Sequence, residues 1–597
     1  MMGDDATPAP PLYSALHVSH AGIWLATPDG ETRVISRGEA VRTAADRPVV
    51  VLGAPMIGQR LGYPDLSGLD LLELFAFVHP ARFAVPTPKG MADALGIAGG
   101  SVADADVPRL LLACAGKLLA TLSAGDWAER VGAWDTAQAL HRLRWPWGGI
   151  VAARIPTPQS AEPGLFARLP EWEEEQARPQ PRPVIIPPLA AVERLADLTG
   201  HGAEQRPGQR AMAQAVTQIF APRQKRGAPV MLLAEAGTGI GKTLAYLAPA
   251  AEWTAASGGT VHISTFTKNL QRQLARETRR LYSSEAEHRA RVVVRKGREN
   301  YLCLLNLEDA LQGGFAGRAA IFARLAARWA AYTRDGDMVG GDLPGWLPTL
   351  FRRAGATALT DRRGECVYAG CPHWRRCFIE RSARASRSAD IVIANHALVV
   401  VNAARGREGE SPPTRMIFDE GHHLFDAADS MFAATLSGQE AIELRRWVIG
   451  PEGKSKGRRR GLAARLADVA SYDDAGAEAI EAARIAALAL PADGWLARQG
   501  GDGEPDGPIE QLLAAVRAMV YARDAASDRP DGDAGYGLEA ELAEPDGRLT
   551  SAAMDAVAAL DALLRPLTLL GQRMEALLNE PPDWMDGQAR ARVEGAL

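Results

Sequence analysis

A glycine-rich turn near the middle of the chain constrains the fold more than any other feature of the sequence. It lies between the short apolar run Val230–Leu233 and a helical pattern that opens at Lys242. The turn consists of Gly237, Thr238, Gly239, Ile240 and Gly241. An apolar run of this length predicts a buried parallel strand. The strand, the turn and the start of the helix follow the P-loop pattern G-x-x-x-x-G-K-[ST], which is matched in its second half. Ala236 stands where that pattern usually begins with glycine.

The residue types of this turn suit a phosphate group. Glycines let the backbone N–H groups wrap around phosphate oxygens, and the start of the following helix adds the positive end of its dipole. In such a turn the Lys242 ammonium reaches the β- and γ-phosphates, and the Thr243 hydroxyl holds Mg²⁺. The alternative is a turn that binds nothing, which the preceding apolar run and the Gly-Lys-Thr sequence disfavour.

Two adjacent acids follow another apolar run, Met416–Phe418. Asp419 at the end of such a strand would hold Mg²⁺ through water, and Glu420 would orient and deprotonate the attacking water. Two acids after a strand are weak evidence alone, because many surface turns look the same. Paired with an upstream P-loop, they indicate hydrolysis of a nucleoside triphosphate.

Short apolar runs alternate with helical patterns after residue 200, which is typical of an α/β sheet with parallel strands. The other expected strands are Val261–Thr265, Val292–Val294 and Ile391–Ala394. A long segment, about 303 to 388, lies between two of them and looks inserted. From about Leu424 the chain is rich in Ala and Leu at helical spacing. A chain of 597 residues predicts about four domains.

An acidic and proline-rich stretch, 171–188, separates the N-terminal part from the rest. It contains the acids Glu171, Glu173, Glu174 and Glu175, followed by five prolines. Such a composition predicts an extended, semi-rigid linker.

The net charge of −5 conceals two basic segments. Residues 268–300 carry a net charge of +6 and residues 362–387 carry +5, whereas residues 501–548 carry −8. Basic segments suit a phosphate backbone, although each could also be a solvated helix face. No targeting signal and no apolar stretch of 18 residues is visible, so we expect a cytoplasmic protein without a membrane span.

Four of the five cysteines fall within the inserted segment: Cys303, Cys366, Cys371 and Cys377. Their number suggests a metal site, and the spacing C-x4-C-x5-C favours an Fe–S cluster over the paired C-x2-C of zinc ribbons. Zinc with His373 as a ligand and four unrelated thiols remain alternatives. Cys114 lies in an apolar run and is expected in a core.

Taken in order, these segments resemble the XPD/DinG-like family of superfamily-two DNA helicases. The resemblance rests on Arg206-x-x-Gln209, Glu235–Thr243, Ser264–Leu274, Lys296–Cys303, the spaced cysteines, Ala389–Leu398 and Asp419–His422. In this family Ala is usual at the first P-loop position. Gly421 replaces Ala in the family's D-E-A-H box, a small-for-small change.

The resemblance implies a RecA-like motor that binds ATP and Mg²⁺ and moves 5′ to 3′ on single-stranded DNA, with forked DNA as a further substrate and roles in DNA repair and replication. It implies that Arg206 and Gln209 read adenine and that the four cysteines hold a [4Fe–4S] cluster. Lys268, Arg298 and Tyr301 become candidate DNA contacts by charge and stacking. We expect a monomer.

The implied domains are a degenerate exonuclease-like domain (1–170), a linker (171–195), a motor domain in two parts (196–302 and 388–425), a cluster insert (303–387) and a helical arch (426–597). The motifs of a second motor domain, including its arginine-bearing motif, are not found. An arginine finger contributes about 10³- to 10⁵-fold in rate. We therefore expect the chain to bind ATP, to hydrolyse it slowly and not to unwind DNA. The alternative is a nucleotide-gated DNA-binding regulatory module.

The N-terminal part resembles exonuclease domains of the DnaQ type near Leu69–Leu74 and Lys89–Gly96. His17 and Ser19 stand where the catalytic Asp-x-Glu would fall, so a two-metal mechanism could not assemble. An unrelated accessory domain is the alternative. Asp70 and Glu73, one helical turn apart, are expected on a solvated face.

Overall fold

The computed structural model describes residues 13–66, 68–97, 102–174, 178–200, 204, 206–225, 227–237, 239–351, 355–361, 366, 368–405, 413–450, 452, 461–525, 538–542 and 544–597. The chain divides into two compact units. Unit 1 comprises Met1–Leu307, Gly317–Asp361 and Arg375–Ala433, and unit 2 comprises Glu308–Ala316, Arg362–Trp374 and Ala434–Leu597.

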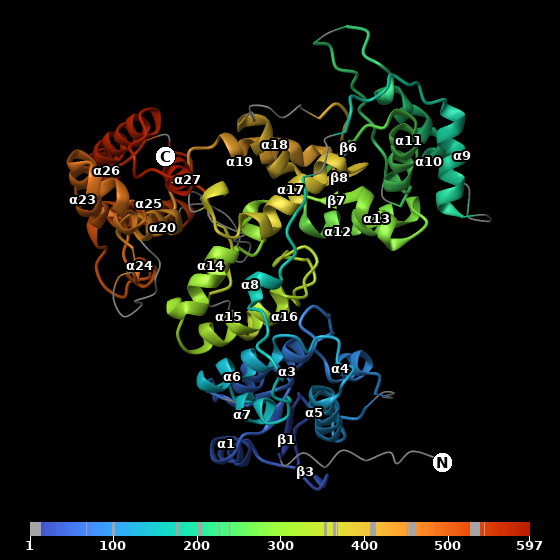
Figure 1. Ribbon diagram of the computed structural model, residues 1–597, viewed down its shortest axis with the longest axis vertical. Helices are drawn as coiled ribbons and strands as arrows, with labels where there is room; N and C mark the ends of the chain where they lie inside the picture. The colour runs from blue at the N-terminus through green and yellow to red at the C-terminus, as the bar shows by residue number, and fades with distance from the viewer. Residues whose placement is uncertain are drawn as a thin grey trace. The chain divides into compact units, whose positions relative to one another are not determined.

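The N-terminal part of unit 1 contains a mixed five-stranded sheet with strand order β3-β2-β1-β4-β5, drawn in blue in Figure 1. Strand β1 (Ala15–Val18) pairs antiparallel with β2 (Ile23–Ala26), and β2 pairs antiparallel with β3 (Thr32–Val34). Strand β4 (Val50–Val51) is parallel to β1, and β5 (Leu69–Asp70) is parallel to β4. The helices of this part are α1 (Arg37–Asp46), α2 (Ala54–Leu61), α3 (Leu71–Val78), α4 (Pro88–Leu95), α5 (Val107–Ser123), α6 (Ala133–Arg142), α7 (Gly148–Ala152) and α8 (Leu165–Arg168). Cys114 is buried on α5, which confirms its prediction as a core residue.

Asp70 and Glu73 are both buried, so the prediction of a solvated face is wrong. Asp70 caps α3 and accepts three backbone hydrogen bonds of 2.6 to 3.1 Å. Glu73 accepts hydrogen bonds from the Trp145 indole at 2.7 Å and from the Arg318 guanidinium at 2.6 Å. Partners distant in sequence make burial of both carboxylates possible, because a buried polar group is tolerated when it is hydrogen-bonded.

The N-terminal part packs on α15 (Gly317–Ala330) through a buried arginine. The Arg328 guanidinium donates hydrogen bonds to the carbonyls of Phe77 and Glu129, and it lies 4.6 Å from the centre of the Phe77 ring. Burial lowers the pKa of Arg328 to about 10. The neighbouring α16 (Trp346–Leu350) adds a hydrogen bond of 2.9 Å from the Trp346 indole to the carbonyl of Ala84. The N-terminal part and this section of the inserted segment therefore share one packed interface.

The second part of unit 1 contains a four-stranded parallel sheet with strand order β7-β8-β6-β9. Its strands are β6 (Val261–Thr265), β7 (Val292–Val294), β8 (Ile391–Asn395) and β9 (Met416–Phe418). All four lie where the apolar runs predict strands, and together with the surrounding helices they confirm the α/β class. In the register of the sheet, Ser264 of β6 lies between Ala394 of β8 and Phe418 of β9.

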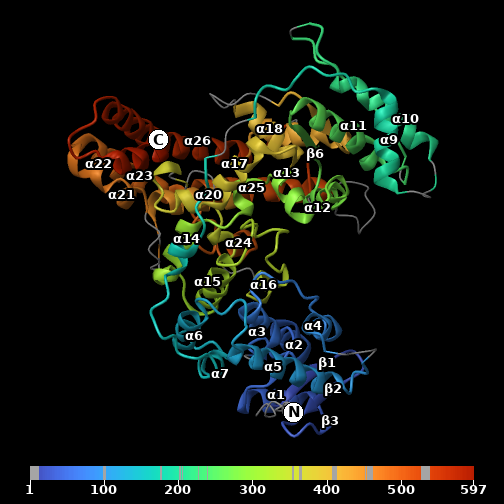
Figure 2. The ribbon, with the colours of Figure 1, turned by 45° about the vertical axis from the view of Figure 1, so that its right-hand side comes forward.

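Helices α9 (Pro188–Thr199), α10 (Pro207–Val216) and α11 (Lys242–Ser257) pack against one another, as both ribbon views show (Figures 1 and 2). The other helices around the parallel sheet are α12 (Lys268–Glu277), α13 (Glu285–Arg291), α17 (Phe378–Ser388), α18 (His396–Arg405) and α19 (Leu424–Phe432). Helix α14 (Leu304–Asp309) opens the inserted segment. Phe220, Leu247, Trp253, Ile263 and Ile391 are buried in the core of this part.

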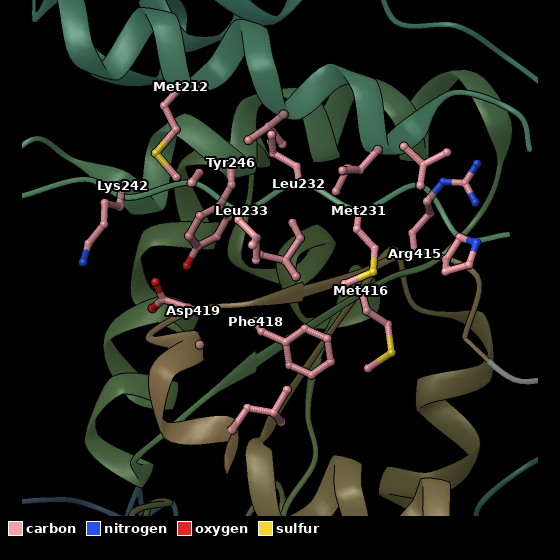
Figure 3. A pocket seen from close by; sticks show the side chains of 18 of the residues that line it. Met212, Met231, Leu232, Leu233, Lys242, Tyr246, Arg415, Met416, Phe418 and Asp419 are labelled. Atoms are coloured by element: carbon pink, nitrogen blue, oxygen red, sulfur yellow. The ribbon is translucent and has the colours of Figure 1, made fainter. Parts of the chain in front are cut away.

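Residues 230–233 form no strand, contrary to the prediction. Met231 and Leu233 are 77% and 93% exposed, and the whole run lies along a cavity rather than in the sheet (Figure 3). Strand β9 is the outer strand of the sheet, and this cavity lies between β9 and residues 229–236. The run lies across the cavity from β9, so its backbone does not pair with this edge of the sheet.

Unit 2 is helical from residue 434 onward in the part of the chain that the structure describes. Its helices are α20 (Gly438–Ile449), α21 (Leu462–Arg465), α22 (Ala467–Tyr472), α23 (Asp474–Ala486), α24 (Trp495–Gln499), α25 (Gly507–Ala525), α26 (Gly547–Asn579) and α27 (Gly587–Ala596). The long helix α26 packs against α23 and α25, and Arg573 on α26 donates two hydrogen bonds to the Asp473 carboxylate. The helical pattern predicted from Leu424 is confirmed for these residues. No described helix is both long and apolar enough to cross a bilayer.

Candidate nucleotide-binding site

The glycine-rich turn leads into α11, whose first residue is Lys242. Gly239 and Gly241 have φ values of +83° and +88°, which favour glycine. A Cβ atom on Gly241 would lie 2.3 Å from the Gln209 side-chain nitrogen, so Gln209 packs directly against this glycine. Thr238 lies outside the described residues.

Arg206 and Gln209 lie directly against this turn. The Gln209 amide donates a hydrogen bond of 2.9 Å to the carbonyl of Gly241, and the Arg206 guanidinium donates to the carbonyl of Gly239. Arg206 precedes α10 and Gln209 lies in its first turn, so one short helix positions both side chains. The structure thus brings together the two upstream residues and the turn that the sequence singled out.

The acidic pair at the end of β9 faces the start of α11. The Lys242 ammonium lies 2.9 Å from a carboxylate oxygen of Glu420. Glu420 has a φ of +55°, an uncommon backbone conformation for a residue with a side chain. The hydrogen bond from Lys242 is the main reason that the pKa of Glu420 is lowered. Burial, followed by the charge of Glu420, raises the pKa of Asp419.

Tyr246, one helical turn after Lys242, was not singled out from the sequence. Its side chain is buried, and its hydroxyl points toward Asp419 (Figure 3). Burial together with the Asp419 charge raises the pKa of this hydroxyl well above its ordinary value. The i, i+4 spacing from Lys242 was the available signal, because it places both side chains on one face of α11.

A buried histidine connects the acidic pair to β6. His396 Nδ1 is hydrogen-bonded at 2.7 Å to the hydroxyl of Ser264, and both side chains are buried. His396 Nε2 lies 3.4 Å from the carbonyl oxygen of Glu420. The ring of Phe266, two residues after Ser264, stacks on His423 with centroids 3.8 Å apart. His396 lies in a segment that carries the family resemblance, but its partners could not be read from the sequence.

A cavity of about 1080 Å³ adjoins these residues. Residues 229–236 line one side and β9 lines the other, and much of the lining is Met and Leu side chains. Lys242 and Asp419 lie at one end of the cavity and Arg415 lies at the other (Figure 3). The cavity therefore has charged side chains at both ends and a mainly apolar lining between them.

These residues fit Mg²⁺ and a nucleotide phosphate by the chemistry of their donors. Carboxylate, hydroxyl and water oxygens are the ligands that Mg²⁺ prefers, and Asp419 and Thr243 supply two of these kinds. The buried hydroxyl of Tyr246 points toward the same carboxylate.

The four cysteines of the inserted segment are divided between the two units. Cys303 and Cys377 belong to unit 1, and Cys366 and Cys371 belong to unit 2. None of the four is in a disulfide. Among the residues that the structure describes, no group of three or more His, Cys, Asp or Glu side chains forms a metal cluster. His373 is hydrogen-bonded to Glu308 at 2.9 Å. Four thiols are the donor set that an Fe–S cluster uses.

The three candidate DNA contacts differ in their exposure and partners. Lys268 begins α12 and is partly exposed, and Arg298 forms an ion pair with Asp361. Tyr301 is buried, and its hydroxyl lies 3.2 Å from that of Ser382. The ring of Tyr301 is therefore not available to stack on a base, which corrects that expectation.

No family model matches the chain. The chain is 35% identical over 254 residues to the ATP-dependent DNA helicase YoaA of Escherichia coli, covering 41% of this chain and 37% of that protein. It is 33% identical over 257 residues to the ATP-dependent helicase DinG of Mycobacterium tuberculosis, covering 40% and 37%. It is 28% identical over 228 residues to the 3′-5′ exonuclease DinG of Bacillus subtilis, covering 38% and 23%.

The chain thus spans little more than a third of the length of the first two relatives. Both are named as ATP-dependent helicases, in agreement with the resemblance drawn from the motifs. Over a segment of about two fifths of its length, this chain is similar to proteins named as YoaA and DinG helicases.

Proposed function

We propose that the chain carries the ATP-binding motor domain of a DinG/XPD-type DNA helicase, formed by residues 196–302 and 388–425. ATP hydrolysis would drive 5′ to 3′ movement on single-stranded DNA, at forks and during repair. The observation that carries this proposal is the pair of Lys242 and Glu420, which meet at 2.9 Å with Asp419 beside them. A lysine at a helix start opposite an acidic strand end is the arrangement that hydrolysis of a nucleoside triphosphate requires.

Each residue has a distinct part in the proposed reaction. Lys242 exchanges the Glu420 carboxylate for phosphate oxygens when ATP enters, which leaves Glu420 free to orient a water and accept its proton. Thr243 and Asp419 would hold Mg²⁺, which when bound neutralises charge on the β- and γ-phosphates. Arg206 and Gln209, already seated on the turn, would read the adenine ring.

We propose that Cys303, Cys366, Cys371 and Cys377 hold a [4Fe–4S] cluster in the insert 303–387 and that the helices of 426–597 form the arch. The donor set of four thiols supports the cluster. Anaerobic purification should give a coloured protein with iron and acid-labile sulfide, and Cys377→Ser should lose both. A colourless protein that contains zinc would contradict this proposal.

We propose that residues 1–170 form a non-catalytic exonuclease-like domain. The mixed sheet and the side chains at the end of β1 support this proposal. The Ser19 hydroxyl donates a hydrogen bond to Asp104, and His17 lies 3.7 Å from the same carboxylate. A single carboxylate held in this way does not supply the acidic pair that a two-metal nuclease needs.

ATP hydrolysis by the chain, measured with and without poly(dT), tests the proposed function. Hydrolysis should be slow with and without DNA, because the sequence shows no arginine-bearing motif of a second motor domain, and Lys242→Ala should remove the residual hydrolysis in both conditions. ATP binding without any hydrolysis would favour a nucleotide-gated DNA-binding module instead. Binding of neither ATP nor DNA would reject both functions.

A further inference from the structure

The predicted linker crosses a basic helix and packs on it. We call residues Pro170–Glu174 the strap. Trp172 of the strap is buried, and the guanidinium carbon of Arg384 on α17 lies 3.5 Å from the centre of its ring. The guanidinium carbon of Arg375 lies 5.6 Å from the centre of the same ring, and the backbone N–H of Trp172 donates a hydrogen bond of 2.8 Å to the carbonyl of Arg375. Two guanidinium groups therefore lie close to the indole ring.

The acidic residues of the strap pair with the same basic surface. Glu171 lies 2.7 Å from the Arg376 guanidinium, and Glu174 lies 2.9 Å from that of Arg384. The Arg381 guanidinium donates a hydrogen bond of 2.6 Å to the carbonyl of Pro170. Four of the five arginines between residues 375 and 387 thus contact these five residues.

These are the contacts by which proteins bind a single nucleic-acid strand. Guanidinium groups stack on the flat faces of bases and pair with the phosphates between them. The strap offers the flat indole of Trp172, with the carboxylate of Glu171 before it in the sequence and that of Glu174 after it. Its groups therefore match those of a nucleotide strand, and the surface on which it lies belongs to one of the two basic segments.

We propose that the arginine surface formed by Arg375, Arg376, Arg381 and Arg384 binds single-stranded DNA, and that the strap occupies it as an intramolecular mimic of the strand. This proposal rests on the proposed function. It adds a DNA-binding surface and a competitor built into the chain. DNA and the strap exclude each other on this surface, so the strap reduces the affinity for DNA.

The charged side chains of the strap are more exposed than its buried Trp172. Glu171 and Glu174 are 47% and 71% exposed, so solvent and competing anions reach both ion pairs. On the far side, Arg178 donates hydrogen bonds to the carbonyls of Gly259 at 2.8 Å and Ser388 at 2.9 Å. This anchor remains when the strap moves.

The test measures binding of fluorescein-labelled (dT)20 to the full chain by anisotropy at several salt concentrations. The double variant Glu171→Gln/Glu174→Gln removes both charges and keeps Trp172. Each phosphate contact on a single strand contributes a slope of about −0.7 in log K against log[salt]. Two released arginines should steepen the slope by about 1.4 and tighten binding up to about 25-fold at 0.1 M salt.

Two further sets of variants sharpen the comparison. Adding Arg376→Gln and Arg384→Gln to the double variant should abolish the gain in affinity. Glu594→Gln serves as the matched control, because Glu594 pairs with Arg590 at 2.8 Å on α27 and is half exposed. It should leave the Kd within about twofold. Thermal unfolding of every variant checks that it is folded.

If the double variant binds the oligonucleotide with the same Kd and the same salt slope as the wild type, the strap proposal alone is overturned. A gain that survives the arginine substitutions would also overturn it. If no variant binds the oligonucleotide, then the DNA-binding part of the proposed function fails as well.

Discussion

Glu420→Gln should have opposite effects on ATP binding and ATP hydrolysis. The Glu420 carboxylate lies 2.9 Å from the ammonium of Lys242, the residue proposed to bind phosphate. Glutamine keeps the size of the side chain and removes its charge. The lysine is then free to bind phosphate, and the repulsion between carboxylate and phosphate is lost. ATP should therefore bind more tightly.

The exposure of the pair sets the size of this effect. The Lys242 and Glu420 side chains are 29% and 33% exposed, and an ion pair so open to solvent is worth about 0.2 to 1 kcal/mol. The Kd for MgATP should fall about 1.4- to 5-fold. Loss of the general base should lower the single-turnover rate of hydrolysis by about 10² to 10⁴.

Titration with a fluorescent ATP analogue measures the Kd, and quenched-flow hydrolysis with protein in excess measures the single-turnover rate. Glu594→Gln, which changes the same functional group far along the chain, should alter neither. Weaker ATP binding by Glu420→Gln, or a rate within tenfold of the wild type, would refute the roles assigned to this pair.

Three further changes test other parts of the structure. Arg328→Met should lower the free energy of unfolding by about 2 to 5 kcal/mol, because it leaves buried carbonyls unpaired, and chemical denaturation measures this. His396→Ala should lower the single-turnover rate by up to about 100-fold while ATP affinity changes less than threefold, because it positions Glu420 without contacting ATP. A loss of ATP affinity as large as the loss of rate would contradict the role of His396 in positioning Glu420. Burial lowers the pKa of His262 from 6.5 to about 4, so stability should fall by up to about 3 kcal/mol between pH 6.5 and 4. His262→Gln should flatten this dependence, and an unchanged slope would refute it.

The parallel sheet was readable from the sequence because its strands are short apolar runs between helical patterns. The four runs that form β6 to β9 pack against helices on a shared core, so their composition alone carries the information. Val230–Leu233 has the same composition but lies beside a cavity at the outer edge of the sheet. Composition does not show whether a strand partner is within reach.

The candidate site was predictable where a residue acts through local spacing. Lys242 belongs to the turn, and Asp419 and Glu420 end a strand. His396 could not be assigned, because its role depends on contacts between elements far apart in the chain. The burial of Asp70 and Glu73 was not predicted for the same reason, because their hydrogen-bond partners are distant in the sequence. For Tyr246 the one local signal was its i, i+4 spacing from Lys242.

The linker shows most clearly that local sequence patterns do not predict contacts between distant segments. Its acids and prolines predict an extended spacer, and the strap indeed contains no helix or strand. Its contacts with α17 join residues about 200 positions apart, such as Trp172 and Arg384. No local pattern specifies such a pairing.

Equilibrium binding of MgATP to the wild-type chain and to Lys242→Ala tests the central claim most directly. We predict saturable binding at one site in the wild type, competition by ADP, and loss of binding in the variant, because the lysine lies at the helix start where phosphate is proposed to bind. Wild-type binding that Lys242→Ala leaves unchanged, or no binding of ATP by the wild type, would contradict the assignment of this site.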